Sequence, residues 1–188
     1  MATLAIAALP SLGCWPWGPE GAGWLEAKIN LQLAGTRLVE TYRGTGNFDA
    51  DRNRLIGNRL EFVLSSATMD PTYPAEFRIL GLGVGLPEPG VHPLSYLSQE
   101  QLERPSAQGF VATFIRAGEG FIATSGEIEI SESSGDRIVG TFHFVGFLYC
   151  PVHGGCVVPA APPEDAATVE VEGAFEAHPM VTSGEPIG

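Results

Sequence analysis

Residues 118–147 read GEGFIATSGEIEISESSGDRIVGTFHFVGF, and this stretch decides the fold class of the chain. Two runs in which apolar and polar residues alternate, 121–131 and 136–147, flank a polar turn with the sequence ESSGD. In the first run, Ile128 and Ile130 alternate with Glu127 and Glu129. Strict alternation on both sides of a short polar turn is the pattern of a long β-hairpin with one buried and one wet face.

The same period-two alternation recurs along the chain, most clearly in residues 24–35, WLEAKINLQLAG. Further runs of this kind cover residues 38–48, 60–66, 76–84, 109–117 and 167–177. One exception is residues 98–104, where Ser98 and Gln101 form a capping box and Pro105 ends a short helix. We therefore expect an all-β fold, an antiparallel β-sandwich (or barrel) of about eight or nine strands with one short helix.

At 188 residues, the chain has the length of one domain with an ordinary core. We expect a signal-like segment and linker over residues 1–23, the β domain over 24–177, and a disordered tail over 178–188. The segment 18–23, GPEGAG, is suited to tethering the domain.

The first residues, MATLAIAALPSLGCWPW, contain an apolar run at 4–9 that is followed by PSLGC. This resembles the end of a bacterial lipoprotein signal peptide, where a small residue precedes the cysteine that receives lipid. Gly13 and Cys14 match that pattern, so the resemblance implies lipidation at Cys14. Ser11 departs from the usual Leu, and no Lys or Arg precedes the apolar run. Because a bilayer-spanning helix needs about 20 apolar residues, we expect contact with a membrane only through the lipid anchor.

The charge balance excludes one class of partner. The chain has 22 acidic and 10 basic residues, for a net charge of -12, and its only lysine is Lys28. Nucleic-acid binding requires clustered lysine and arginine, so we expect no nucleic-acid partner.

Two cysteines, Cys150 and Cys156, bracket the short loop PVHGG. If Cys14 carries lipid, they form the remaining pair, and an oxidising compartment would join them in a disulfide. The alternatives are two free thiols, or a zinc site formed by Cys150, His153 and Cys156, which would still need a fourth ligand. A looser calcium site is a further alternative at Asp49 and Asp51, although the rest of an EF-hand loop is absent. No other cofactor is indicated.

Four glutamates, Glu127, Glu129, Glu170 and Glu172, are predicted to point outward from strands that we expect to be neighbours. Such a face could hold calcium, bind a protein or carbohydrate ligand, or supply the acid of a carbohydrate-active or other hydrolase. A solvated face that prevents sheets from associating is the simpler explanation. Since no serine lies in a nucleophile-elbow motif, the sequence does not identify an enzyme.

The last third of the chain resembles a group of uncharacterised bacterial secreted or lipid-anchored β-sandwich domains. The resemblance rests on GEIEI at 126–130, GTFHF at 140–144 and VEVEGAF at 169–175. It implies a β-sandwich at the bacterial cell envelope or outside the cell, and it brings no catalytic residues. The expected function is a binding or structural role for a lipid-anchored or secreted β domain, with a hydrolase and a metal-binding protein as alternatives.

Overall fold

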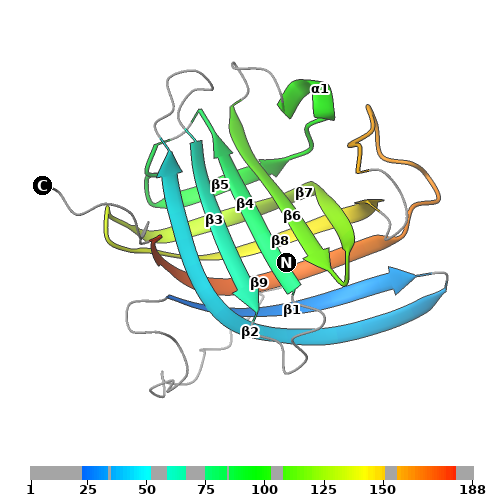
Figure 1. Cartoon of the computed structure of the whole chain (residues 1–188), viewed down its shortest axis with the longest axis horizontal. Helices are drawn as coiled ribbons and strands as arrows, with labels where there is room; N and C mark the ends of the chain where they lie inside the picture. The colour runs from blue at the N-terminus through cyan, green and yellow to red at the C-terminus, as the bar shows by residue number, and fades with distance from the viewer. Residues whose placement is uncertain are drawn as a thin grey trace, which may run out of the picture.

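The structure is a computed structural model, and it describes residues 23–33, 35–51, 59–66, 75–83, 85–102, 108–150 and 156–180 (Figure 1). These residues form nine strands and one short helix. The elements are β1 (Trp24–Leu33), β2 (Thr36–Asp51), β3 (Arg59–Ser66), β4 (Ala75–Leu82), β5 (Gly90–Ser95), α1 (Gln99–Leu102), β6 (Gly109–Arg116), β7 (Glu119–Ser133), β8 (Ile138–Cys150) and β9 (Thr168–Pro179). The all-β fold and the long hairpin, now β7 and β8, are confirmed.

All nine strands belong to one sheet whose order of neighbours is β1-β2-β3-β4-β6-β5-β7-β8-β9. β9 also pairs with β1, so the order closes on itself. In Figure 1, β3, β4 and β6 cross in front of β7, β8 and β9. The first and last strands, β1 and β9, are therefore paired along nearly their whole length.

The expectation of a purely antiparallel sheet is wrong, because two contacts are parallel. β2 meets β9 at Asn47 and Phe48, and β5 meets β6 at Leu94. Each case has the same geometric cause. β2 and β9 are both antiparallel to β1, so they run in the same direction and meet where β1 has not yet begun. β5 and β6 are likewise both antiparallel to β7.

The interior of the closed sheet is filled with aromatic side chains. Phe77 stacks on Phe114 with ring centroids 4.9 Å apart, and Phe62 meets Phe175 edge-on at 5.2 Å. Four apolar residues of β1 that the alternation predicted as inward are buried: Leu25, Ala27, Ile29 and Leu31. Packing of this kind, with several large rings in mutual contact, supplies most of the burial that stabilises a domain of this size.

One glycine of the hairpin is required by close packing. A Cβ added at Gly140 on β8 would overlap the carbonyl oxygen of Glu129 on β7 and lie 3.2 Å from the Phe175 ring. Gly135, in the turn of the same hairpin, has nothing within 4 Å of the equivalent position. The first glycine is thus needed for contact between strands, whereas the second is not.

The short helix forms with the predicted cap. The backbone N–H of Ser98 donates to Gln101 Oε1 at 2.9 Å, and the Gln101 N–H donates to Ser98 Oγ at 3.4 Å. This reciprocal pair satisfies donors that the first turn of a helix leaves without partners. Among the described residues, no helix is long and apolar enough to cross a membrane.

Two boundaries differ from the expected ones. β2 extends through Asp51, so Asp49 and Asp51 lie on a strand opposite Glu61 and Arg59 and not in a loop. β9 extends to Pro179, because pairing with β2 continues beyond the last alternating residue. Residues 181–188 and the whole signal-like segment, with Cys14, lie outside the described residues.

Candidate functional site

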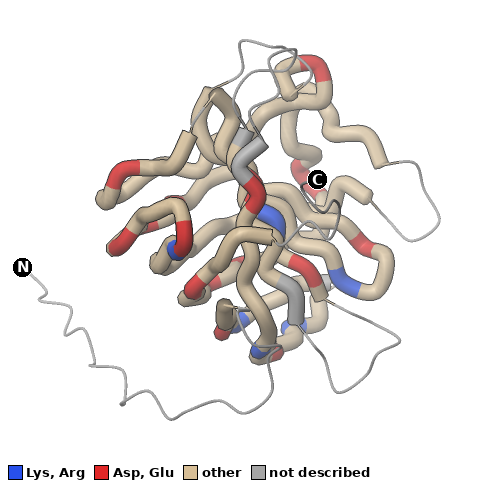
Figure 2. The backbone as a smooth tube through the Cα atoms, turned by 60° about the vertical axis from the view of Figure 1, so that its left-hand side comes forward, with Lys and Arg blue, Asp and Glu red and all other residues tan. Residues whose placement is uncertain are grey.

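The strand order brings the four predicted glutamates onto the same exposed side of the sheet. Glu127 on β7 lies opposite His143 on β8, His143 lies opposite Glu172 on β9, and Glu172 lies opposite Lys28 on β1. Glu170 and Glu129 belong to the rows on either side. The sequence therefore predicted that the glutamates share one face of the sheet. It did not predict that basic residues would lie between them. Figure 2 shows basic segments lying beside acidic ones along the strands.

A chain of polar contacts crosses four strands of this face. Arg37 Nε on β2 donates to Asn30 Oδ1 on β1 at 2.7 Å, and Asn30 Nδ2 donates to Glu170 Oε2 on β9 at 3.2 Å. His143 Nε2 on β8 lies 3.5 Å from Glu170 Oε1. In the neighbouring row, Lys28 Nζ lies 3.3 Å from Glu172 Oε1. The two β9 carboxylates thus each have a partner of their own.

The contacts of Glu170 change its acidity. The hydrogen bond from Asn30, followed by the contact with His143, lowers the pKa of the Glu170 carboxyl below its ordinary value. Donors that stabilise the ionised form always act in this direction. A general acid of a hydrolase needs the opposite shift, so this environment favours an ionised acceptor for a ligand.

Two adjoining hollows follow the polar chain. The two hollows are open surface depressions of about 290 Å³ and about 160 Å³, and both are lined by Asn30 and Glu170. The larger is also lined by Gln32, Val145, Thr168 and Val169, and the smaller by Lys28, Arg37, Val39 and Glu172. Two of the lining side chains are apolar and exposed, Val39 at 51% and Val145 at 37%. We call this surface, across β8, β9, β1 and β2, the outer face. Glu127 and Glu129 do not line either hollow.

Searches against protein-family models, curated proteins and solved structures each found no match to this chain.

The predicted disulfide is present. Cys150, the last residue of β8, is bonded to Cys156, with 4.4 Å between the two Cα atoms. With their sulfurs joined, neither cysteine is available as a thiolate for the zinc alternative, and His153 lies outside the described residues. Within the described ranges, no group of three His, Cys, Asp or Glu side chains is placed to hold a metal ion. A disulfide of this kind is typical of a non-reducing environment such as the envelope or the extracellular space.

Exposed aromatic residues can stack on a sugar or on a partner protein, and the sequence places five of them in predicted loops or strand ends: Trp15, Trp17, Tyr73, Tyr96 and Tyr149. Tyr96 and Tyr149 are half-buried and pack against apolar neighbours on the outside of the sheet, where burial raises the pKa of both hydroxyls. Trp15, Trp17 and Tyr73 lie outside the described residues.

Sequence reasoning missed a polar group inside one end of the closed sheet. Arg116 on β6 donates to Glu40 on β2 through Nη2 at 2.6 Å and Nε at 2.9 Å. Tyr42, whose ring meets Phe77 and Phe114 in the core, also hydrogen-bonds Glu40. Arg116 follows the buried Phe114 by two residues, so the alternation places both on the inner face of β6. A charged residue at an inward position was the signal in the sequence for a buried polar group. Its partner, 76 residues away, was not visible in the sequence.

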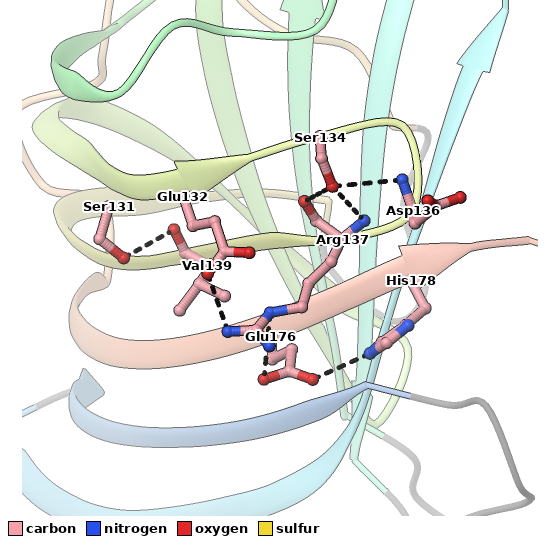
Figure 3. Close-up of polar contacts among 8 residues, drawn as sticks. All are labelled: Ser131, Glu132, Ser134, Asp136, Arg137, Val139, Glu176 and His178. Atoms are coloured by element: carbon pink, nitrogen blue, oxygen red, sulfur yellow. Dashed lines mark hydrogen bonds and ion pairs between the residues drawn. The ribbon is translucent and has the colours of Figure 1, made fainter.

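A second group ties the β7–β8 turn to β9, and Figure 3 shows it. Arg137 Nη2 donates to Glu132 at 2.9 Å and Arg137 Nε lies 3.7 Å from Glu176, whose other oxygen is 2.9 Å from His178 Nε2. Ser134 Oγ accepts the backbone N–H groups of Asp136 and Arg137, which shapes the turn (Figure 3). These contacts are internal to the fold, and we assign them a structural role.

Proposed function

We propose that this protein is a lipid-anchored or secreted β domain of the bacterial cell envelope that binds a protein partner through its outer face. The observation that carries the proposal is the chain of contacts Arg37–Asn30–Glu170–His143, which borders two adjoining hollows. We further propose that the closed order of neighbours is that of a barrel. Since aromatic side chains fill the interior, the scaffold offers its binding groups on the outside.

The composition of the outer face favours a protein over a carbohydrate. It offers an ionised carboxylate, amides, a guanidinium and exposed valines, which is the mixture of polar rim and apolar contact found at protein–protein interfaces. The side chains that line the hollows include no aromatic ring on which a sugar could stack.

Location supports the proposal in two ways. The Cys150–Cys156 disulfide belongs to a non-reducing compartment. The PSLGC segment resembles a lipoprotein signal, with Cys14 as the lipidated residue.

Replacement of Cys14 by serine should move the protein from the membrane to the soluble fraction of its host, and intact mass should show loss of a lipid adduct. An unchanged distribution, with a mass that differs only by the replacement of sulfur by oxygen, would mean that Cys14 is not lipidated.

The binding proposal is tested by site-specific photo-crosslinking in the native envelope. A photoreactive residue at Gln32, which lines the larger hollow, should give a discrete protein adduct, and one at the exposed residue Glu88 should not. Glu170→Lys should abolish the adduct because it reverses the central charge, whereas the matched control Glu88→Lys should keep it. Equal adducts from both positions would refute the outer face as the site. Retention of a purified envelope polysaccharide that Glu170→Lys abolishes would refute a protein as the ligand.

A further inference from the structure

A second apolar cluster lies on the outside of the sheet, separate from the interior core. Its sheet residues are Val111 on β6, Ile122 on β7 and Phe147 on β8, and Ile122 and Phe147 are paired across the two strands. They are only 1%, 1% and 3% exposed. Their strand neighbours, such as Phe114 and Phe121, point into the interior. We call these three outward residues the outer cluster.

Two chain segments cover the outer cluster. One is the connection between β5 and β6, which contributes Tyr96, Leu97 and Leu102. The other is residues 156–167, which we call the strap, and which buries Val158 against the cluster. Without these segments, three large apolar side chains on adjacent strands would face water.

The strap is held at separate points along its length. Tyr96 Oη donates to the Pro159 carbonyl at 2.5 Å, and the Gln99 N–H donates to the Val158 carbonyl at 3.3 Å. At its far end, the Leu148 N–H on β8 donates to the Ala167 carbonyl at 2.8 Å. At its near end, the disulfide joins Cys156 to the end of β8.

The strap depends on these attachments because it forms no helix or strand of its own. Ordering an irregular segment costs conformational entropy at every residue, and scattered single hydrogen bonds offset only part of that cost. A covalent link removes part of that cost, because it keeps the start of the segment close to its docking site in every state of the chain. Since the sequence separation of the two cysteines is only 6, this contribution is at the low end for a disulfide. The interior core does not need this link, since the disulfide joins β8 to the strap and not one strand to another.

We propose that the Cys150–Cys156 disulfide is a redox latch that holds the strap over the outer cluster. When a dithiol reductant breaks the S–S bond, each cysteine gains a hydrogen as a thiol and the reductant becomes a disulfide. The strap is then released and the part of the outer cluster that Val158 covers is exposed, while the closed sheet remains folded. The chain therefore presents this apolar patch in a reducing compartment and covers it once oxidised.

Hydrogen exchange measured by mass spectrometry tests the latch on the folded wild-type protein, with and without dithiothreitol. Reduction should make the amides of Gln99 and Leu148, which donate to strap carbonyls, exchange on the order of tenfold faster or more, with no change in β1 and β2. Binding of a dye for exposed apolar surface should rise in parallel. The double variant Cys150→Ser/Cys156→Ser should reproduce both effects without reductant. Oxidised Tyr96→Phe, which loses one hydrogen bond but keeps the latch, should change exchange far less.

Two results would overturn the proposal. If the Gln99 and Leu148 amides keep their protection after confirmed reduction, the hydrogen bonds and Val158 hold the strap without the disulfide. If protection falls throughout the sheet, the disulfide stabilises the whole fold and not a local cover. Because reduction is applied to protein that has already folded, poor folding of the serine variant does not prevent either reading.

Discussion

The polar group inside the sheet allows a quantitative prediction for Arg116→Met. This change removes the guanidinium that makes two hydrogen bonds to Glu40 and leaves a carboxylate beside the aromatic core. The side chains of Arg116 and Glu40 are 24% and 28% exposed. Loss of one partner of a fully buried pair costs about 3–5 kcal/mol, and an exposed pair contributes about 0–1 kcal/mol. Since Glu40 retains some access to water, we expect a loss of about 2 kcal/mol in the free energy of unfolding.

Thermal and urea unfolding followed by circular dichroism measure this loss. For a chain of this size, about 2 kcal/mol lowers Tm by roughly 4–8 °C. A double-mutant cycle with Glu40→Gln should show a coupling energy of about 1–2 kcal/mol, because each single change removes the same contact. The matched control is Lys28→Met, which breaks a pair whose side chains are 58% and 62% exposed, and it should cost under about 0.5 kcal/mol. Equal Tm shifts for the two variants, or a coupling energy near zero, would refute the assignment of Arg116 as a partly buried partner of Glu40.

Three further predictions follow from single residues. Burial, and then the hydrogen bond with Glu40, raises the pKa of Tyr42 to about 12, so the folded state keeps the hydroxyl proton to a higher pH than the unfolded state does. The free energy of unfolding should therefore fall as pH rises from about 10 to about 12. Urea titrations should show a smaller fall with pH for Tyr42→Phe. Gly140→Ala should cost about 1–3 kcal/mol in urea unfolding because its methyl group overlaps a neighbouring strand, whereas Gly135→Ala should cost much less, and equal effects would contradict the packing argument. Asn30→Ala removes the main donor to Glu170, so NMR titration should find that carboxyl pKa moved up toward its ordinary value; an unchanged pKa would mean that the hydrogen bond does not act on it.

Much of the local structure could be predicted from the sequence because it depends on neighbours along the chain. Alternation over a few residues identified the hairpin of β7 and β8 and the buried side of β1. The capping box at Ser98 and the disulfide between Cys150 and Cys156 join residues only a few positions apart, and both were found.

Features that depend on which strands become neighbours were not predictable in the same way. The strap is a proline-rich stretch whose sequence predicts a loop, and nothing in that sequence indicates that it covers the outer cluster. The extension of β2 through Asp49 and Asp51 depends on pairing with β3, which overrides the polar composition of that segment. The partner of Arg116 likewise depended on the closure of the sheet.

By itself, the sequence determined that the chain is all-β, which side of β1, β7, β8 and β9 is buried, and that the acidic residues of β7 and β9 face outward. Alternation carries this information because successive side chains of a strand point to opposite faces. Only the tertiary structure decided that β9 lies between β8 and β1, which places His143, Lys28 and Asn30 beside the glutamates and makes the β2–β9 contact parallel. The physical reason is that alternation specifies which face of a strand is buried but not which strand pairs with it. Strand neighbours are set when the sheet closes around its aromatic core.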